Sequence, residues 1–101
     1  MSTLIKVAEL NELKPGECKI VTAGDRELAL CNVAGQLRAI DNHCPHRDGP
    51  LGEGVLAGNL ITCPWHGWRF DVTTGQSPVV PTAKVETFEV VVEGNDVKVR
   101  I

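Results

Sequence analysis

Short apolar runs, separated by Gly, Asn and Asp, dominate the sequence and predict a protein built mostly from antiparallel β-strands. The clearest runs, near the C-terminus, alternate apolar with polar or exposed positions. In residues 88–92 and again in residues 97–101, every second residue is apolar. Gly94 and Asn95 separate these two runs, and such a pair is typical of a two-residue hairpin turn. Because strand side chains point alternately to opposite faces, one face of this hairpin is expected to be buried.

Similar runs recur through the rest of the chain. They predict strands over Glu17–Thr22, Arg26–Val33 and Gln36–Asp41, and shorter ones over Val55–Leu56, Leu60–Thr62 and Arg69–Asp71. Residues 8–13 predict a single helical turn that ends before Pro15 and Gly16. No segment has the pattern of a long amphipathic helix, so the predicted fold class is all-β.

Composition narrows the class of protein. The 101 residues, 43% hydrophobic and 23% charged, suit one globular domain. A net charge of −3 gives no basic stripe, which argues against a nucleic-acid partner and permits docking on basic protein surfaces. Neither a basic, apolar leader nor an apolar run of membrane-spanning length is evident, so we expect a cytoplasmic protein without a membrane partner.

The candidate chemistry lies in two motifs, C-P-H at residues 44–46 and C-P-W-H at residues 63–66. Cys44 and His46, with Cys63 and His66, make a complete set of four metal ligands delivered as two mixed pairs. A [2Fe–2S] cluster explains the mixing if each motif gives one ligand to each iron. A structural zinc module is the alternative, although zinc motifs usually separate the Cys pair from the His pair.

The segment from His43 to the Arg-Phe-Asp run at residues 69–71 resembles the cluster-binding segment of Rieske-type ferredoxins. The resemblance implies that Cys44 and Cys63 bind one iron and that His46 and His66 bind the other. It also implies an antiparallel β-sandwich or barrel with an inserted small cluster-binding lobe. Residues 1–101 would form one domain, with the lobe at about 42–72 and a basal β domain at about 1–41 and 73–101.

A Rieske-type ferredoxin carries single electrons and is not itself an enzyme. The resemblance implies a flavin-dependent ferredoxin reductase as electron donor and a terminal oxygenase as acceptor. A small Rieske-like subunit of an assimilatory nitrite reductase, or of another multicomponent redox enzyme, is the alternative. An oxygenase active site would need two further His and a carboxylate on a second iron, and His43 is the one histidine left.

Residues beside the motifs bear on the reduction potential. In high-potential Rieske proteins, a disulfide over the cluster joins two positions that correspond to Gly49 and Trp65, so this chain lacks it. Those proteins also place Ser and Tyr hydroxyls at positions that match Trp68 and Phe70. Because hydroxyl donors favour the reduced cluster, their absence predicts a reduction potential at the low end of the Rieske range, about −150 mV.

Further residues are expected to shape the surroundings of the cluster, each with a simpler alternative. Gly49, Gly52, Gly54 and Gly67 suit close backbone approaches, or are plain turn glycines. Trp65 is interpreted as a hydrophobic lid, with core packing as the alternative. Pro78 or Pro81 is expected in a loop that covers the cluster, unless that loop is a simple connector.

The remaining candidate residues receive structural interpretations. Cys18 and Cys31 lie in strand-like runs and are predicted to be small buried hydrophobic residues rather than a disulfide. His43 is interpreted as a surface or hydrogen-bonding residue rather than a metal ligand.

Overall fold

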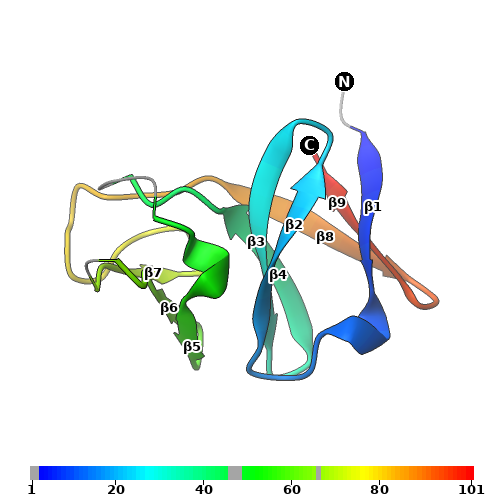
Figure 1. Cartoon of the computed structure of the whole chain (residues 1–101), viewed down its shortest axis with the longest axis horizontal. Helices are drawn as coiled ribbons and strands as arrows, with labels where there is room; N and C mark the ends of the chain where they lie inside the picture. Colours follow the sequence, from blue (N-terminus) through cyan, green and yellow to red (C-terminus); the bar gives the residue numbers. More distant parts are fainter. Residues whose placement is uncertain (1–2, 46–48, 66) are drawn as a thin grey trace.

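The computed structural model describes residues 3–45, 49–65 and 67–101, which form two antiparallel sheets (Figure 1). The larger sheet contains, in order across it, β1 (Leu4–Glu9), β9 (Asp96–Arg100), β8 (Thr87–Glu93), β4 (Gln36–Asp41), β3 (Arg26–Val33) and β2 (Cys18–Ala23). The smaller sheet contains β5 (Val55–Ala57), β6 (Leu60–Thr62) and β7 (Arg69–Asp71). The predicted all-β class is confirmed.

The larger sheet curls into a nearly closed barrel, in which the edge strands β1 and β2 lie close to each other. Apolar side chains from the sheet fill the interior and include Ala8, Val21, Leu28, Leu30, Val97 and Val99. The chain ends meet at one side, where Thr3 and Ile101 exchange two backbone hydrogen bonds of 3.0 Å. A closed sheet of this kind leaves few unpaired strand edges.

Strands β3 and β4 form a wall with an apolar core on each side. In β3, Leu28 and Leu30 point into the barrel, whereas Ala29 and Cys31 belong to a second core outside it. This division follows the two-residue period of a strand, in which neighbouring side chains point to opposite faces. The outer face of the wall therefore supports the part of the chain that carries both sequence motifs.

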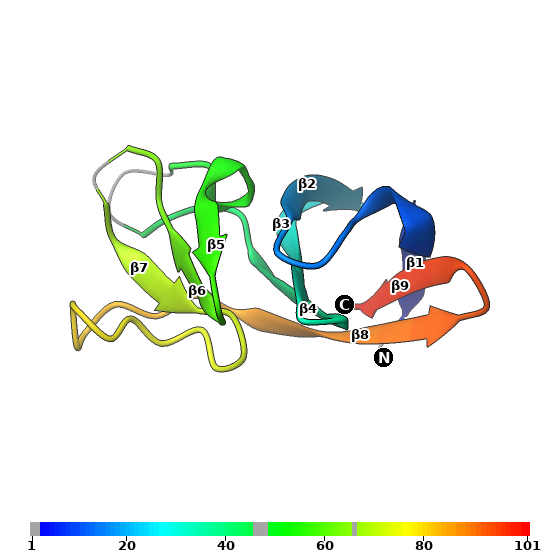
Figure 2. The same cartoon turned by 90° about the horizontal axis from the view of Figure 1, so that it is seen from below.

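The smaller sheet lies beside the barrel, against that outer face (Figure 2). A short 3₁₀ helix, η2 (Leu51–Glu53), packs on β2 and β3 and leads into β5. The segment between β7 and β8 then runs along the small sheet and returns the chain to the barrel (Figure 2). Leu51, Ile61, Phe70 and Val72 fill the second core from the small-sheet side.

Most predicted elements are present, with ends that differ by one residue or not at all. The C-terminal hairpin turns at Gly94, whose φ of +62° suits a tight turn. The predicted helical turn over residues 8–13 is a shorter 3₁₀ helix, η1 (Leu10–Glu12). Residues 8 and 9 instead end β1, a strand that the sequence analysis missed, because they pair with Val97 and Asp96.

Candidate metal centre

The first motif forms a loop directly after β4. Backbone hydrogen bonds close this loop: Leu51 N–H donates to the Asn42 carbonyl over 2.8 Å, and Cys44 N–H donates to the Gly49 carbonyl over 3.0 Å. The Asn42 side chain is buried and accepts a third bond, of 2.7 Å, from Gly52 N–H. No motif in the sequence marks Asn42, although its buried amide and its carbonyl tie the chain before the motif to the chain after it.

The second motif forms the loop between β6 and β7. Cys63 N–H donates to the Trp68 carbonyl over 2.7 Å, and Gly67 N–H donates back to the Cys63 carbonyl over 3.1 Å. Each motif cysteine thus donates its N–H to the carbonyl five residues further along, which is Gly49 in the first loop and Trp68 in the second. The two motif cysteines are therefore held by equivalent backbone hydrogen bonds.

The two motif cysteines belong to the same buried core. Cys44 is 1% exposed and Cys63 is 2% exposed. Gly49, from the first loop, lies against the second cysteine, because a β-carbon at position 49 would be 2.5 Å from the Cys63 sulfur. Two sulfur atoms withdrawn from water on adjoining loops suit a bound metal or metal–sulfur cluster. His46 and His66 lie outside the described residues.

Gly49 and Trp65 face each other across the two loops. A β-carbon at position 49 would be 3.5 Å from the Trp65 β-carbon, and the β-carbons of a disulfide are about 3.5–4.5 Å apart. The two positions therefore have a spacing that a disulfide could bridge, although this chain has Gly and Trp there. Trp65 is 57% exposed, so the alternative that it packs in the core is wrong.

Phe70 and Trp68 lie on the inner side of the second loop. Phe70, in β7, is fully buried in the core that contains both motif cysteines. Trp68 is half-buried and packs against the same core. A close approach of Gly67 to the cluster stays a prediction, and none of the described residues would lie within 4 Å of a β-carbon at this glycine. Its φ of +74° explains the glycine, since other residues rarely adopt that backbone conformation.

The proline-containing loop after β7 is held by side chains that the sequence analysis did not single out. Ser77 is buried, and its hydroxyl accepts bonds from Val79 N–H at 3.2 Å and Val80 N–H at 3.0 Å. The Gln76 amide donates to the Pro81 carbonyl over 3.0 Å. A serine directly before a proline signals such a turn. Pro81 is exposed, and the prediction that it covers a cluster stays a prediction.

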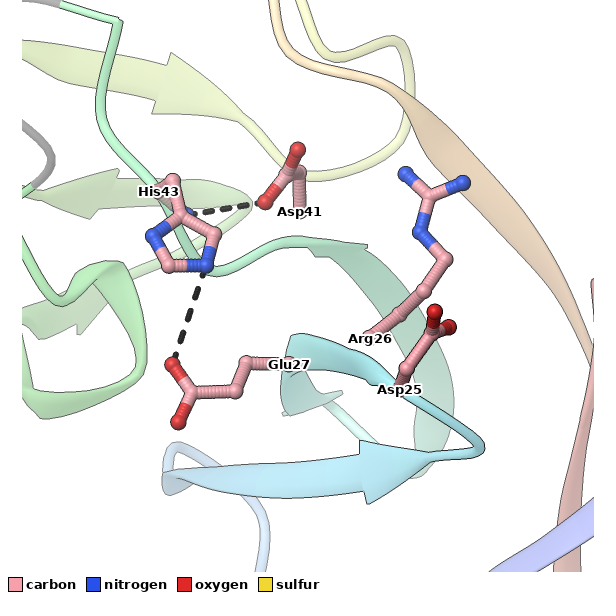
Figure 3. Close-up of a pocket in the computed structure, with 5 residues that line it drawn as sticks. All are labelled: Asp25, Arg26, Glu27, Asp41 and His43. Carbon is pink, nitrogen blue, oxygen red and sulfur yellow. Dashed lines mark hydrogen bonds and ion pairs between the residues drawn. The ribbon is translucent and has the colours of Figure 1, made fainter.

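His43 points into a surface pocket of about 440 Å³ that it lines with Asp25, Arg26, Glu27 and Asp41 (Figure 3). Its ring Nε2 is 3.7 Å from a Glu27 carboxylate oxygen. Its backbone N–H donates to the Asp41 carboxylate over 2.9 Å. His43 is exposed, which agrees with its interpretation as a surface residue.

Comparison with known proteins agrees with this architecture. The family model of the Rieske [2Fe-2S] domain matches residues 3–89. The chain belongs to the Rieske [2Fe-2S] family and is an electron carrier of the ferredoxin type, with a Rieske-type [2Fe–2S] cluster as its cofactor. It is 38% identical to the ferredoxin component of the naphthalene 1,2-dioxygenase system of Pseudomonas aeruginosa, over 94% of this chain and 92% of that protein.

Two solved structures extend the similarity to the fold. The ferredoxin of carbazole 1,9a-dioxygenase from Nocardioides aromaticivorans superposes with a TM-score of 0.89 and 33% identity, covering 96% of both chains. A chain in a complex of reduced oxygenase and oxidised ferredoxin of carbazole 1,9a-dioxygenase gives 0.87 and 35% identity, covering 95% of this chain and 91% of that one. Within the described residues, no helix is long and apolar enough to cross a membrane.

Proposed function

We propose that Cys44 and Cys63 bind one iron of the cluster and that His46 and His66 bind the other. The observation that carries this assignment is the pairing of two buried cysteines on loops closed by equivalent backbone hydrogen bonds. The mixed Cys and His content of each loop supports a cluster with two different irons rather than zinc. When bound, the cluster takes up and releases one electron.

The protein's own residues hold the cluster and limit its contact with water. The core around Cys44 and Cys63 contains Leu51, Ile61 and Phe70, each fully buried, which keeps the inner side of the site dry. Trp65 is exposed beside Gly49 on the outer side. Electron transfer to a partner would therefore take place across the outer surface of the two loops. We assign them to a cluster-binding lobe at about residues 42–72.

The proposed partners are a flavin-dependent reductase as donor and a ring-hydroxylating terminal oxygenase as acceptor. The relatives named above support this, since one belongs to a naphthalene 1,2-dioxygenase system and another was solved in complex with its oxygenase. A cytoplasmic location is part of the same proposal. The proposal predicts that the reduced protein transfers one electron to such an oxygenase, which stopped-flow absorption measures directly.

Spectroscopy and metal analysis of the purified protein test the cluster. We expect two irons and two inorganic sulfides per chain, visible absorption of the oxidised protein, and an electron paramagnetic resonance signal after one-electron reduction. A colourless protein with one zinc per chain and no signal on reduction would refute the electron-carrier function and favour the structural zinc module.

Substitution with matched controls tests the ligand assignment. Cys44→Ala and Cys63→Ala are expected to abolish the cluster, whereas Cys31→Ala, in the same buried core, is expected to retain it. Likewise His46→Ala and His66→Ala are expected to lose the cluster, and His43→Ala to keep it. Iron content and absorption of each variant are the readouts. Loss of the cluster in a control variant, or its full retention in a ligand variant, would contradict the assignment.

A further inference from the structure

Outside the metal centre, Cys18 in β2 lies directly opposite Cys31 in β3. The neighbouring pair, Glu17 and Asn32, is joined by a 2.9 Å bond from Asn32 N–H to the Glu17 carbonyl. Because hydrogen-bonded and non-hydrogen-bonded pairs alternate along an antiparallel ladder, the two cysteines form a non-hydrogen-bonded pair, in which side chains approach most closely. Their sulfur atoms are 2.6 Å apart.

The backbone between the two strands already has the spacing that a disulfide needs. Opposite α-carbons in an antiparallel pair are about 4.5–5.5 Å apart, and disulfides join α-carbons about 4.4–6.8 Å apart. No disulfide joins the two cysteines in this structure. A bond between them would therefore require side-chain rotation but no shift of either strand.

The two thiols differ in their access to solvent. Cys31 is fully buried, whereas Cys18, the first residue of the edge strand β2, is half-buried. The predicted burial is complete for Cys31 and only partial for Cys18, which packs against the second core, and the two are not joined by a disulfide in this structure. The hydrogen bond with Cys18, together with burial, raises the pKa of the Cys31 thiol above its usual range. A small oxidant from solvent therefore meets Cys18 first, with Cys31 directly behind it.

We propose that Cys18 and Cys31 form a reversible redox site, which a peroxide converts from a dithiol into a cross-strand disulfide. The Cys18 thiolate attacks one peroxide oxygen, the O–O bond breaks, and Cys18 becomes a sulfenic acid while hydroxide leaves. The Cys31 sulfur then attacks the Cys18 sulfur, and the sulfenic oxygen departs as water with the thiol proton. Overall, two thiols and one hydrogen peroxide give one disulfide and two waters, and a dithiol reductant reverses the reaction.

The disulfide would link β2 to β3, the two barrel strands on which η2 packs next to the metal centre. Ile20, two residues after Cys18, packs against Gly52 of η2, since a β-carbon at Gly52 would be 2.6 Å from Ile20 Cγ1. Strand β2 is an edge strand, so β3 is its hydrogen-bonded neighbour in the sheet. A covalent bond between β2 and β3 would therefore hold the support of η2 in place under oxidising conditions.

Peptide mapping of the cluster-loaded protein tests the proposal. The protein is treated with hydrogen peroxide in anaerobic buffer, remaining thiols are blocked with N-ethylmaleimide, and the chain is digested with trypsin. Because Lys14 precedes a proline, the four cysteines fall in four different peptides, residues 7–19, 27–38, 39–47 and 48–69. We expect peptides 7–19 and 27–38 to be linked, with a mass about 2 Da below their sum, and to separate on treatment with dithiothreitol.

The variant Cys18→Ala is the control, since it removes one thiol at the edge of the sheet and leaves the proposed ligands in place. It is expected to keep the visible spectrum and to yield no linked peptide. Oxidised wild-type protein is expected to melt about 5–15 °C above the reduced form, with no such shift in the variant. Three results for Cys18 would overturn the proposal: labelling by N-ethylmaleimide after peroxide treatment, oxidation without a disulfide, or a disulfide between two chains. A disulfide from Cys18 or Cys31 to Cys44 or Cys63 would overturn it as well.

Discussion

Gly54 lies directly against the backbone of Thr62, because a β-carbon at position 54 would overlap the Thr62 carbonyl oxygen. Thr62 ends β6 and immediately precedes Cys63. Gly54 immediately precedes β5, which pairs with β6 from Val55 opposite Thr62. The absence of a side chain at position 54 therefore sets how closely the chain between η2 and β5 approaches the end of β6, directly before the second motif cysteine.

We predict that Gly54→Ala destabilises the small sheet and displaces Cys63. The new methyl group meets a backbone carbonyl rather than a flexible side chain, so the strands must separate, at a cost of about 2–3 kcal/mol in the free energy of unfolding. Iron content per chain and anaerobic urea unfolding are the measurements. We expect most of the purified protein to lack the cluster.

Gly58→Ala is the matched control for this prediction, because Gly58 lies in the turn between β5 and β6 of the same sheet. Its φ is +62°, and among the described residues none would lie within 4 Å of a β-carbon there. Alanine at position 58 should therefore cost only the strain of a left-handed backbone, about 1 kcal/mol, and keep the cluster. Equal iron loss in the two variants would refute the role given to the Gly54–Thr62 contact.

Phe70→Tyr is predicted to raise the reduction potential. Phe70 is fully buried in the same core as Cys44 and Cys63, and it offers no hydrogen-bond donor. A hydroxyl that donates to the site favours the more negative reduced state. One such bond is worth at most about 1.5–3 kcal/mol, which corresponds to a rise of at most ~65–130 mV for one electron.

A redox titration of Phe70→Tyr and Phe70→Leu separates hydrogen bonding from packing. The leucine variant changes the shape of the core without adding a donor, so its potential should stay near that of the wild type. An unchanged or lower potential in the tyrosine variant would show that the hydroxyl does not reach the cluster or its ligands.

Much of the fold could be predicted because its signals are local. Alternating apolar residues mark β8 and β9, short apolar runs mark β3 and β4, and Gly94 marks the hairpin turn between the last two strands. The motif cysteines Cys44 and Cys63 follow the predicted strands β4 and β6. These features depend on neighbours in the sequence, so periodicity and turn residues are enough to identify them.

Other features depend on contacts between distant segments and could not be predicted. Strand β1 forms against β9, which is more than 80 residues away in the chain. Cys18 and Cys31 lie opposite each other only because of the register between β2 and β3, which the sequence does not reveal. Gly67 and Gly54 look alike in the sequence, yet one is required by its backbone angle and the other by a neighbouring carbonyl. Such differences arise only once the chain is folded.

The turn between β3 and β4 offers a site for stabilisation. Ala34 has a φ of +51° and Gly35 a φ of +96°, so both turn residues are left-handed, as in a type I′ turn. Asparagine adopts this conformation more readily than alanine, and Ala34→Asn is predicted to increase the free energy of unfolding by about 0.5–1 kcal/mol. Urea unfolding measures the change. Ala34→Val should lower the free energy of unfolding. A valine variant that is more stable than the asparagine variant would contradict the turn assignment.

Glu12 is predicted to make stability depend on acid pH. A 2.5 Å hydrogen bond from Glu9 N–H, together with an ion pair of 3.1 Å to Lys19, lowers the pKa of the Glu12 carboxyl in the folded protein below 4.5. A lowered folded-state pKa stabilises the protein above the unfolded-state pKa, and this contribution is lost as pH falls through the folded-state value. Glu12→Gln should therefore melt at a lower temperature than the wild type at pH 7, and the two should converge in strong acid. Thermal unfolding across this pH range measures the effect, and a difference that stays constant down to the lowest pH would contradict the proposed titration.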